Sequence, residues 1–310
     1  MTDVQPRPFR FGVLTKGATS HQQWTSLLAR TEAAGFTSLL MPTHSTPQFS
    51  VTVALADAAV RSRLTIGTLV ANNDLQHPAL LARDAATLAL LSEGRFELGV
   101  GAGWMVRDYT QLGLPLLSGG ARVEKLTEAI SIIRSSWTGE EFSFHGSHYD
   151  LAEFRGLPAT GVPLMMGAGG DRMLALAAAS ADIVSFSRSL SAGNSARDIA
   201  VDATLDSTLR KGRTLAQHLG DRRGSVELNV LAIRVEIGSR YRERVREVAD
   251  ATGLPESDVV DTPENFFAAT AQDMADQLTE RRRLTGISYY VIRDQDIDAC
   301  IPVLARLVGR

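Results

Sequence analysis

His44 is the only histidine of this 310-residue chain that directly follows a predicted strand. It comes after the apolar run 38–41, in the segment Pro42-Thr43-His44. An imidazole titrates near neutral pH and can give or take a proton there. The alternative interpretation is a histidine that caps an element or packs and does no chemistry. The position at a strand end favours proton exchange.

Two glycine-rich segments also follow predicted strands and leave bare backbone that a ligand can approach. Residues 101–103 follow the strand at 96–100. They are not a dinucleotide-binding fingerprint, because the third glycine of G-x-G-x-x-G is missing and Trp104 follows Gly103 instead. Residues 167–170 follow the strand at 163–166 and open a helix rich in alanine and leucine. Unpaired N–H groups and the positive end of the helix dipole at such a turn can hold a phosphate.

Other residues at strand ends offer recognition rather than proton transfer. The Asn72 amide could bind a heterocycle edge, although asparagine is also an ordinary turn former. Trp104 and Tyr109 could form the wall of an aromatic pocket or could simply pack. Arg172 and Arg188 could contact anionic groups of a ligand, and the alternative is a solvated surface arginine.

Composition and motifs exclude several classes of function. A net charge of −3 and a pI near 6.1 give no basic field for nucleic acid or for a membrane surface. The single cysteine, Cys300, excludes an internal disulfide, and no apolar run approaches the roughly 20 residues of a membrane span. Metal-ligand spacings, a serine-hydrolase elbow and a phosphate-binding P-loop are all missing. We therefore expect a cytoplasmic protein with a small-molecule substrate, no bound metal, and no nucleic-acid or membrane partner.

Strand and helix patterns alternate along the chain. Helical stretches include residues 123–137, whose apolar stripe should face a sheet, and a helix that starts at Pro78 with His77 as its cap. Eight strand–helix units predict a (β/α)8 TIM barrel, and a doubly wound sheet is the alternative. The predicted strands are residues 9–14, 38–41, 64–69, 96–100, 163–166, 182–186, 226–235 and 288–292.

We expect a single domain over residues 1–310, with two insertions at the carboxyl-terminal mouth of the barrel. Residues near 140–152 alternate aromatic and polar side chains around Gly146-Ser147, which predicts a hairpin. Residues near 187–224 are polar and partly helical in pattern. Such loops carry the chemistry of barrel enzymes.

The chain resembles the bacterial luciferase-like monooxygenase superfamily. The resemblance rests on the segment 64–104, which contains Ile66-Gly67-Thr68, His77-Pro78 and the run Leu-Leu-Ser-Glu-Gly-Arg-Phe-Glu-Leu-Gly-Val-Gly-Ala-Gly-Trp at 90–104. Residues 163–170 and 181–184 look like a later motif of that family. In detail the chain is most similar to the actinobacterial branch that uses the deazaflavin coenzyme F-420.

The resemblance implies a (β/α)8 barrel that binds a flavin-like ring at its mouth, with His44 beside the reactive carbon. A bulge after the third strand would support the ring, and this bulge often holds a cis peptide between non-proline residues. Thr43 stands where many deazaflavin-dependent members have an acidic residue, so the sequence identifies no carboxylate to assist proton transfer. The implied cofactor contacts are Leu69, Val70, Ala71, Asn72, Gly101, Ala102, Gly103, Gly167, Ala168, Gly169, Gly170, Ser185 and Phe186.

These observations predict hydride transfer between reduced coenzyme F-420 and a small organic substrate with a polarised double bond. His44 would exchange the accompanying proton, while the cofactor carries the redox step. An FMN-dependent monooxygenase supplied with reduced flavin by a separate reductase is the alternative. A barrel that binds flavin without turnover is a third interpretation. The resemblance also implies a homodimer.

Overall fold

The structure is a computed structural model, and it describes residues 7–189 and 195–307. The chain groups into two compact units. Unit 1 consists of Met1–Leu14, Arg30–Thr37 and Ala168–Arg310, and unit 2 consists of Thr15–Ala29 and Ser38–Gly167. Helix α1 (His21–Ala33) contributes residues to both units. Residues 1–6, 190–194 and 308–310, which fall within the predicted domain and within the predicted insertion at 187–224, lie outside the described residues.

Within the described residues, eight strands follow one another around a closed parallel barrel. The sheet order is β3-β2-β1-β13-β10-β9-β8-β5, and β3 also pairs with β5, so the order returns to its start. The (β/α)8 prediction is therefore confirmed, and the doubly wound alternative is wrong. The strands are β1 (Arg10–Leu14), β2 (Ser38–Met41), β3 (Thr65–Thr68), β5 (Phe96–Gly101), β8 (Leu164–Ala168), β9 (Ile183–Phe186), β10 (Glu227–Leu231) and β13 (Ile287–Arg293).

In unit 2, the pairs β2–β3, β3–β5 and β5–β8 are parallel, and β2 and β5 are buried along their whole length. His77 caps α3 as predicted, because its ring accepts the Ala79 N–H at 3.2 Å and Pro78 occupies the first turn. The helices of this unit are α2 (Val51–Arg61), α3 (Pro78–Leu91), α4 (Val106–Leu112) and α5 (Gly119–Thr138). The apolar stripe of α5 is buried from Leu126 to Trp137 as its spacing predicts, and Val123 at its start is half-buried.

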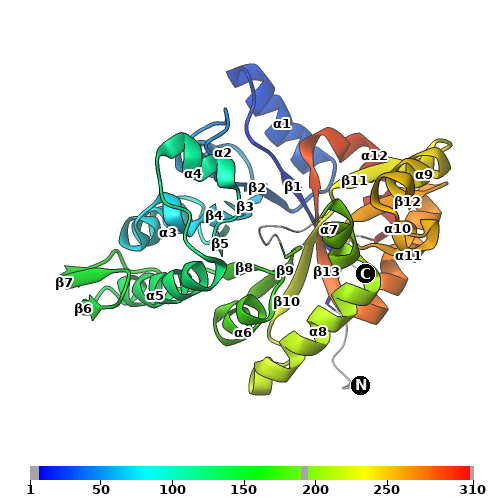
Figure 1. Cartoon of the computed structure of the whole chain (residues 1–310). Helices are drawn as coiled ribbons and strands as arrows, with labels where there is room; N and C mark the ends of the chain where they lie inside the picture. The colour runs from blue at the N-terminus through cyan, green and yellow to red at the C-terminus, as the bar shows by residue number, and fades with distance from the viewer. Residues whose placement is uncertain (1–6, 190–194, 308–310) are drawn as a thin grey trace. The chain divides into compact units, whose positions relative to one another are not determined.

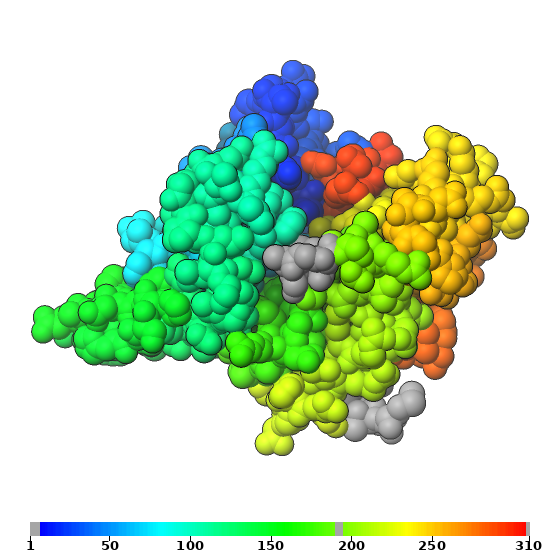
Figure 2. Space-filling view, viewed as in Figure 1, coloured from blue at the N-terminus to red at the C-terminus, as the bar shows by residue number. Residues whose placement is uncertain are grey.

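A hairpin extends unit 2 beyond α5, made of β6 (Glu141–His145) and β7 (Asp150–Arg155), which pair antiparallel. Glu128 on α5 anchors the turn, because its carboxylate accepts the backbone N–H groups of three consecutive residues at 2.8 to 3.1 Å. These hydrogen bonds overcome the effect of burial and hold the pKa of Glu128 below its usual range. Figures 1 and 2 show the hairpin, in green, reaching out past α5.

In unit 1, β1, β13, β10 and β9 are paired in parallel. The prediction of one strand over 226–235 is wrong. The chain leaves β10 after Leu231, and the N–H groups of Ile233 and Arg234 donate to the Glu264 carbonyl instead. A separate parallel pair follows, β11 (Arg234–Ile237) with β12 (Asn265–Ala268), and β12 was not predicted at all.

The helices of unit 1 complete the fold. The predicted insertion near 187–224 contains α7 (Ala196–Ala203), α8 (Leu205–Leu219) and a short 3₁₀ turn, η2 (Gly220–Arg222). A second turn, η3 (Asp294–Asp296), precedes the last helix, and η1 (Asn73–Leu75) lies in unit 2. The remaining helices are α6 (Asp171–Ser180), α9 (Tyr241–Thr252), α10 (Glu256–Asp261), α11 (Ala271–Thr285) and α12 (Ile297–Leu307).

Candidate functional site

His44 follows β2 and forms a close pair with a carboxylate from α4. Its Nδ1 lies 2.8 Å from Oδ2 of Asp108, whose side chain is 1% exposed. The other oxygen of Asp108 accepts the backbone N–H and the hydroxyl of Ser45, each at 2.9 Å. Three hydrogen bonds, one with His44 and two from Ser45, therefore hold the buried carboxylate of Asp108.

The hydrogen bonds decide the charge of Asp108. Burial alone raises the pKa of the carboxyl group, but the hydrogen bonds from His44 and Ser45 outweigh it and hold the pKa below its ordinary value. An ionised carboxylate can only accept hydrogen bonds, so Nδ1 of His44 must carry its proton. The second ring nitrogen, Nε2, is then the atom available for proton exchange with a ligand.

Sequence reasoning missed Asp108. It noted that Thr43 replaces an acidic neighbour of the histidine and identified no carboxylate partner, but the structure supplies one from 64 residues further along the chain. The absence of a carboxylate next to His44 in sequence therefore does not leave the ring without one. The available signal was an aspartate four residues after Trp104, in the segment already singled out for its glycines.

The two predicted aromatic residues lie in different surroundings. Trp104 is 48% exposed, and its ring meets that of His44 edge-on at 6.3 Å between centroids. Tyr109 is buried in the interior, and its hydroxyl donates to Asp74 at 2.8 Å. Burial and the Asp74 carboxylate together raise the pKa of Tyr109. Trp104 can contact a ligand beside His44, whereas Tyr109 supports the loop from within.

The bulge after β3 has the backbone that the family resemblance implies. The peptide bond between Leu69 and Val70 is cis. The Thr43 N–H donates to the Val70 carbonyl at 3.3 Å, which joins the bulge to the segment that carries His44. The next two residues form β4 (Ala71–Asn72), which pairs with the end of β5. The Asn72 side chain accepts the Asp74 N–H at 3.0 Å, so its oxygen serves the turn.

Close packing accounts for the glycines at 101 and 103. A Cβ atom on Gly101 would lie 2.7 Å from Val70 Cγ2. Gly103 has a φ of +75°, and a Cβ there would lie 2.0 Å from the Tyr109 hydroxyl. These glycines let the bulge and Tyr109 pack against the end of β5. Ala102 lies between them and is partly buried.

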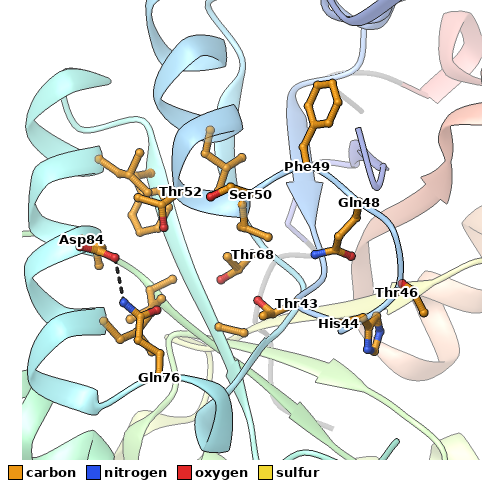
Figure 3. Close-up of a pocket in the computed structure, with 18 residues that line it drawn as sticks. Thr43, His44, Thr46, Gln48, Phe49, Ser50, Thr52, Thr68, Gln76 and Asp84 are labelled. Carbon is orange, nitrogen blue, oxygen red and sulfur yellow. Dashed lines mark hydrogen bonds between the residues drawn. The ribbon is translucent and has the colours of Figure 1, made fainter. Parts of the chain in front are cut away.

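A cavity of about 350 Å³ lies beside His44 within unit 2. Figure 3 shows His44 and Thr46 on one side of it, and Gln76 hydrogen-bonded to Asp84 at 2.8 Å on the side of α3. Among the described residues, the buried Thr46 hydroxyl and the Gln48 side-chain oxygen have no hydrogen-bond partner. Both residues line the cavity, so its polar wall has hydrogen-bonding capacity that the surrounding protein leaves unused.

The second predicted glycine segment lies at the end of β8 and opens α6. In unit 1, a Cβ on Gly169 would lie 2.5 Å from the Ser187 carbonyl oxygen, so only glycine fits there. Gly170 is the N-cap of α6 and provides no side chain to cap it, which leaves the first amides of α6 to other acceptors. Gly167 belongs to unit 2 and Ala168 is buried. Ser185 and Phe186 are buried in β9.

The two predicted anion-binding arginines have separate surroundings. Arg172 is exposed in the first turn of α6. The Arg188 guanidinium donates through Nε and Nη2 to one oxygen of Glu264, so its charge is already compensated. Within residues 7–189 and 195–307, no three histidine, cysteine, aspartate or glutamate side chains gather as a metal site requires, and no helix is long and apolar enough to cross a membrane.

Comparison with known proteins gives curated relatives that are named as F-420-dependent enzymes. The F-420-dependent glucose-6-phosphate dehydrogenase of Nakamurella multipartita is 31% identical over 191 residues, which cover 58% of this chain and 56% of that protein. The chain spans about half the length of the curated relatives it matches.

Solved structures show the same fold over nearly the whole chain. An F-420-dependent secondary alcohol dehydrogenase in complex with an F-420–acetone adduct aligns with a TM-score of 0.76 at 18% identity, covering 97% of this chain and 98% of that one. The oxygenating constituent of 3,6-diketocamphane monooxygenase from Pseudomonas putida, solved with FMN, aligns with a TM-score of 0.70 at 15% identity, covering 98% of each chain.

The family model for luciferase-like monooxygenases matches residues 8–200. This span includes His44, the cis bulge, the glycines after β5 and β8, and Asp108. The chain therefore belongs to the luciferase-like monooxygenase family, as the sequence motifs predicted.

Proposed function

We propose that this protein is an oxidoreductase that transfers a hydride between reduced coenzyme F-420 and a small organic substrate. The observation that carries the proposal is the pairing of His44 with the ionised Asp108, beside the exposed ring of Trp104. The curated relatives that depend on F-420 support the choice of cofactor. When bound, the deazaflavin supplies the hydride chemistry.

The family resemblance assigns residues already described to parts of such a cofactor. The bulge at 69–71 together with Asn72 and residues 101–103 would contact the ring. Gly169 and Gly170, with the uncapped amides of α6, suit a phosphate, because helix N-termini stabilise anions. Gly167, Ala168, Ser185 and Phe186 would line the same part of the cofactor, and Arg172 would add a cation to it.

In the reaction, the protein's own residues orient the imidazole ring of His44 and hold the proton that this ring exchanges. Asp108 fixes His44 with its protonated Nδ1 inward, so Nε2 gives or takes the proton that accompanies hydride transfer. Trp104 forms a flat apolar wall beside His44 for the substrate. Tyr109 acts through Asp74 and Asn72 and holds the loop that follows the bulge.

The second candidate is an FMN-dependent monooxygenase that receives reduced flavin from a partner reductase. The FMN-bound structural neighbour with the same fold favours it. The purified protein should be titrated with F-420 and with FMN while absorbance and fluorescence are recorded. We expect saturable binding of F-420, and turnover of reduced or oxidised F-420 with carbonyl or alcohol substrates. Binding of FMN alone would overturn the first proposal and favour the second.

His44→Ala tests whether the site is catalytic. We expect it to bind F-420 as the wild type does and to lose turnover by roughly 10²-fold or more, the usual contribution of a general acid or base. Binding without turnover in the wild type would support the third interpretation, a barrel that binds the cofactor without chemistry.

The proposal also includes a cytoplasmic location and a homodimer. A cytoplasmic location is consistent with one buried cysteine and no candidate membrane helix among the described residues. A homodimer would cover apolar side chains that α2 and α3 expose, among them Val60 at 77% and Leu90 at 74%.

A further inference from the structure

Unit 1 contains a second cavity, of about 310 Å³, and none of the residues used in the proposed function lines it. Arg188, one of the two predicted anion-binding arginines, is among its lining residues. It lies among α7, α9, α10, β11 and β12, of which the last four are drawn in yellow and orange in Figure 1. Its lining residues are Arg188, Ala196, Ile199, Ala200, Ala203, Arg234, Val248, Ala251, Thr252, Leu254, Val259, Thr262 and Asn265.

The walls of this cavity are apolar and firmly packed. Val248 and Val259 belong to a buried cluster with Val245 and Phe267, and Leu254 packs against it. Ile199 and three alanines of α7 also line the cavity, and alanine side chains are too short to fill it. A ligand body in contact with these walls must itself be apolar.

Two cations line the cavity, and one of them is already neutralised. Arg188 is paired with Glu264, as described above. The nearby Lys211 is buried, and it forms an ion pair with Asp202 at 3.0 Å and donates to the carbonyls of Ser187 and Asp202. Neither of these charges needs a further partner.

Arg234 is different. Its guanidinium donates to the Asn265 side chain at a long 3.4 Å and forms no ion pair among the described residues. Burial lowers its pKa most. Among the largest electrostatic influences on it, the arginines 188, 244 and 293 lower the pKa further, and the Glu264 carboxylate raises it. A partly buried cation in a positive field stabilises an anion placed next to it.

We propose that this cavity binds a monoanion with an apolar body, such as a short-chain aliphatic or an aromatic carboxylate. Arg234 holds the carboxylate by charge-assisted hydrogen bonds, and the aliphatic walls enclose the rest. One uncompensated cation selects a single negative charge. The volume admits on the order of ten non-hydrogen atoms, because a water molecule occupies about 30 Å³. The proposal does not depend on the redox function.

The experiment measures binding of hexanoate to the purified protein by isothermal titration calorimetry, with hexanamide and acetate as probes that lack the charge or the apolar body. We expect one saturable site for hexanoate and at least about tenfold weaker binding of the other two. Arg234→Met should weaken hexanoate binding by about tenfold or more, because it removes the cation and keeps the stem. Ala200→Leu should weaken binding similarly by filling the cavity while Arg234 remains.

The matched control is Arg240→Met, since Arg240 is exposed at the start of α9 and paired with Glu243. Hexanoate affinity should be unchanged in this variant. Circular dichroism establishes that each variant is folded, and Ala200→Leu tests the site even if Arg234→Met does not fold. The proposal is overturned if hexanoate does not bind, if acetate or hexanamide binds equally well, or if a folded Ala200→Leu or Arg234→Met variant keeps wild-type affinity.

Discussion

The chemistry we assign to His44 depends on a second residue that orients it. Asp108 is ionised, buried and hydrogen-bonded to both His44 and Ser45, which fixes the imidazole in one tautomer. Sequence reasoning found the histidine because it directly follows a strand. It could not find the aspartate, because the contact joins residues 64 positions apart and is created only when α4 folds over the end of β2.

Asp108→Asn should lower turnover strongly with little change in KM. The amide has nearly the same shape but carries no charge, so it no longer fixes the proton of His44 on Nδ1. We expect a loss of roughly 10²-fold in kcat, within the range for general acid–base catalysis. Steady-state kinetics with F-420 would measure it.

The chain offers a matched control in a second histidine–aspartate pair. His145 and Asp150 are in contact across the β6–β7 hairpin, but both side chains are exposed. Asp150→Asn should therefore leave turnover unchanged. An equal loss in both variants would mean that the effect of Asp108→Asn is not specific to the site.

Asp108 should also make folding stability sensitive to acid. Its pKa is lower in the folded protein than the ordinary 3.8, so its ionised form stabilises the fold above about pH 4. That contribution is lost as the pH falls from this value through the folded pKa. Urea unfolding between pH 6 and pH 3, at roughly half-unit steps, should show a smaller loss of stability in Asp108→Asn than in the wild type. Parallel curves for the two proteins would contradict this.

At the scale of elements, the barrel strands are predictable because buried parallel strands are short, continuous apolar runs. Seven of the eight predicted strand segments match an observed strand to within two residues at each end. The segment 226–235 failed because its apolar pattern continues across the point where the chain leaves β10 and joins β12. β12 was missed because two phenylalanines between Asn265 and Ala268 are too short a run to indicate a strand.

The pairing of β3 with β5 depends on a glycine that no pattern identified. A Cβ atom on Gly99 would lie 1.9 Å from the Thr68 carbonyl oxygen, and Thr68 also exchanges hydrogen bonds of 2.7 and 2.9 Å with the Gly99 backbone. Gly99→Ala should therefore push these strands apart and lower the free energy of unfolding by about 3 kcal/mol.

Gly119→Ala is the matched substitution for this test. Gly119 begins α5 and has open space around its Cα, so an added methyl group should be neutral or slightly stabilising. Urea denaturation of both variants measures the difference. A Gly99→Ala variant as stable as Gly119→Ala would show that β3 and β5 can separate without cost.

For the whole molecule, the prediction concerns association. Val60 on α2 and Leu90 on α3 are large apolar residues that a monomer would leave in water. Sedimentation velocity should give the mass of a dimer for the wild type. Val60→Glu and Leu90→Glu should each shift the protein towards the 33.4 kDa monomer. Leu157→Glu, at a residue of unit 2 that is 42% exposed, serves as the control. A monomeric wild type would contradict the proposed dimer.

The reactivity of Cys300 can report local unfolding of the protein around α12. This sole sulfhydryl lies fully buried on α12, and burial raises its pKa, so almost none of it is the reactive thiolate. An alkylating reagent should therefore modify the native protein only when α12 detaches, and at a rate set by how often that happens. Mass spectrometry should find one adduct per chain at once in denaturant and slow labelling without it. Rapid labelling of the native protein would contradict the burial of Cys300.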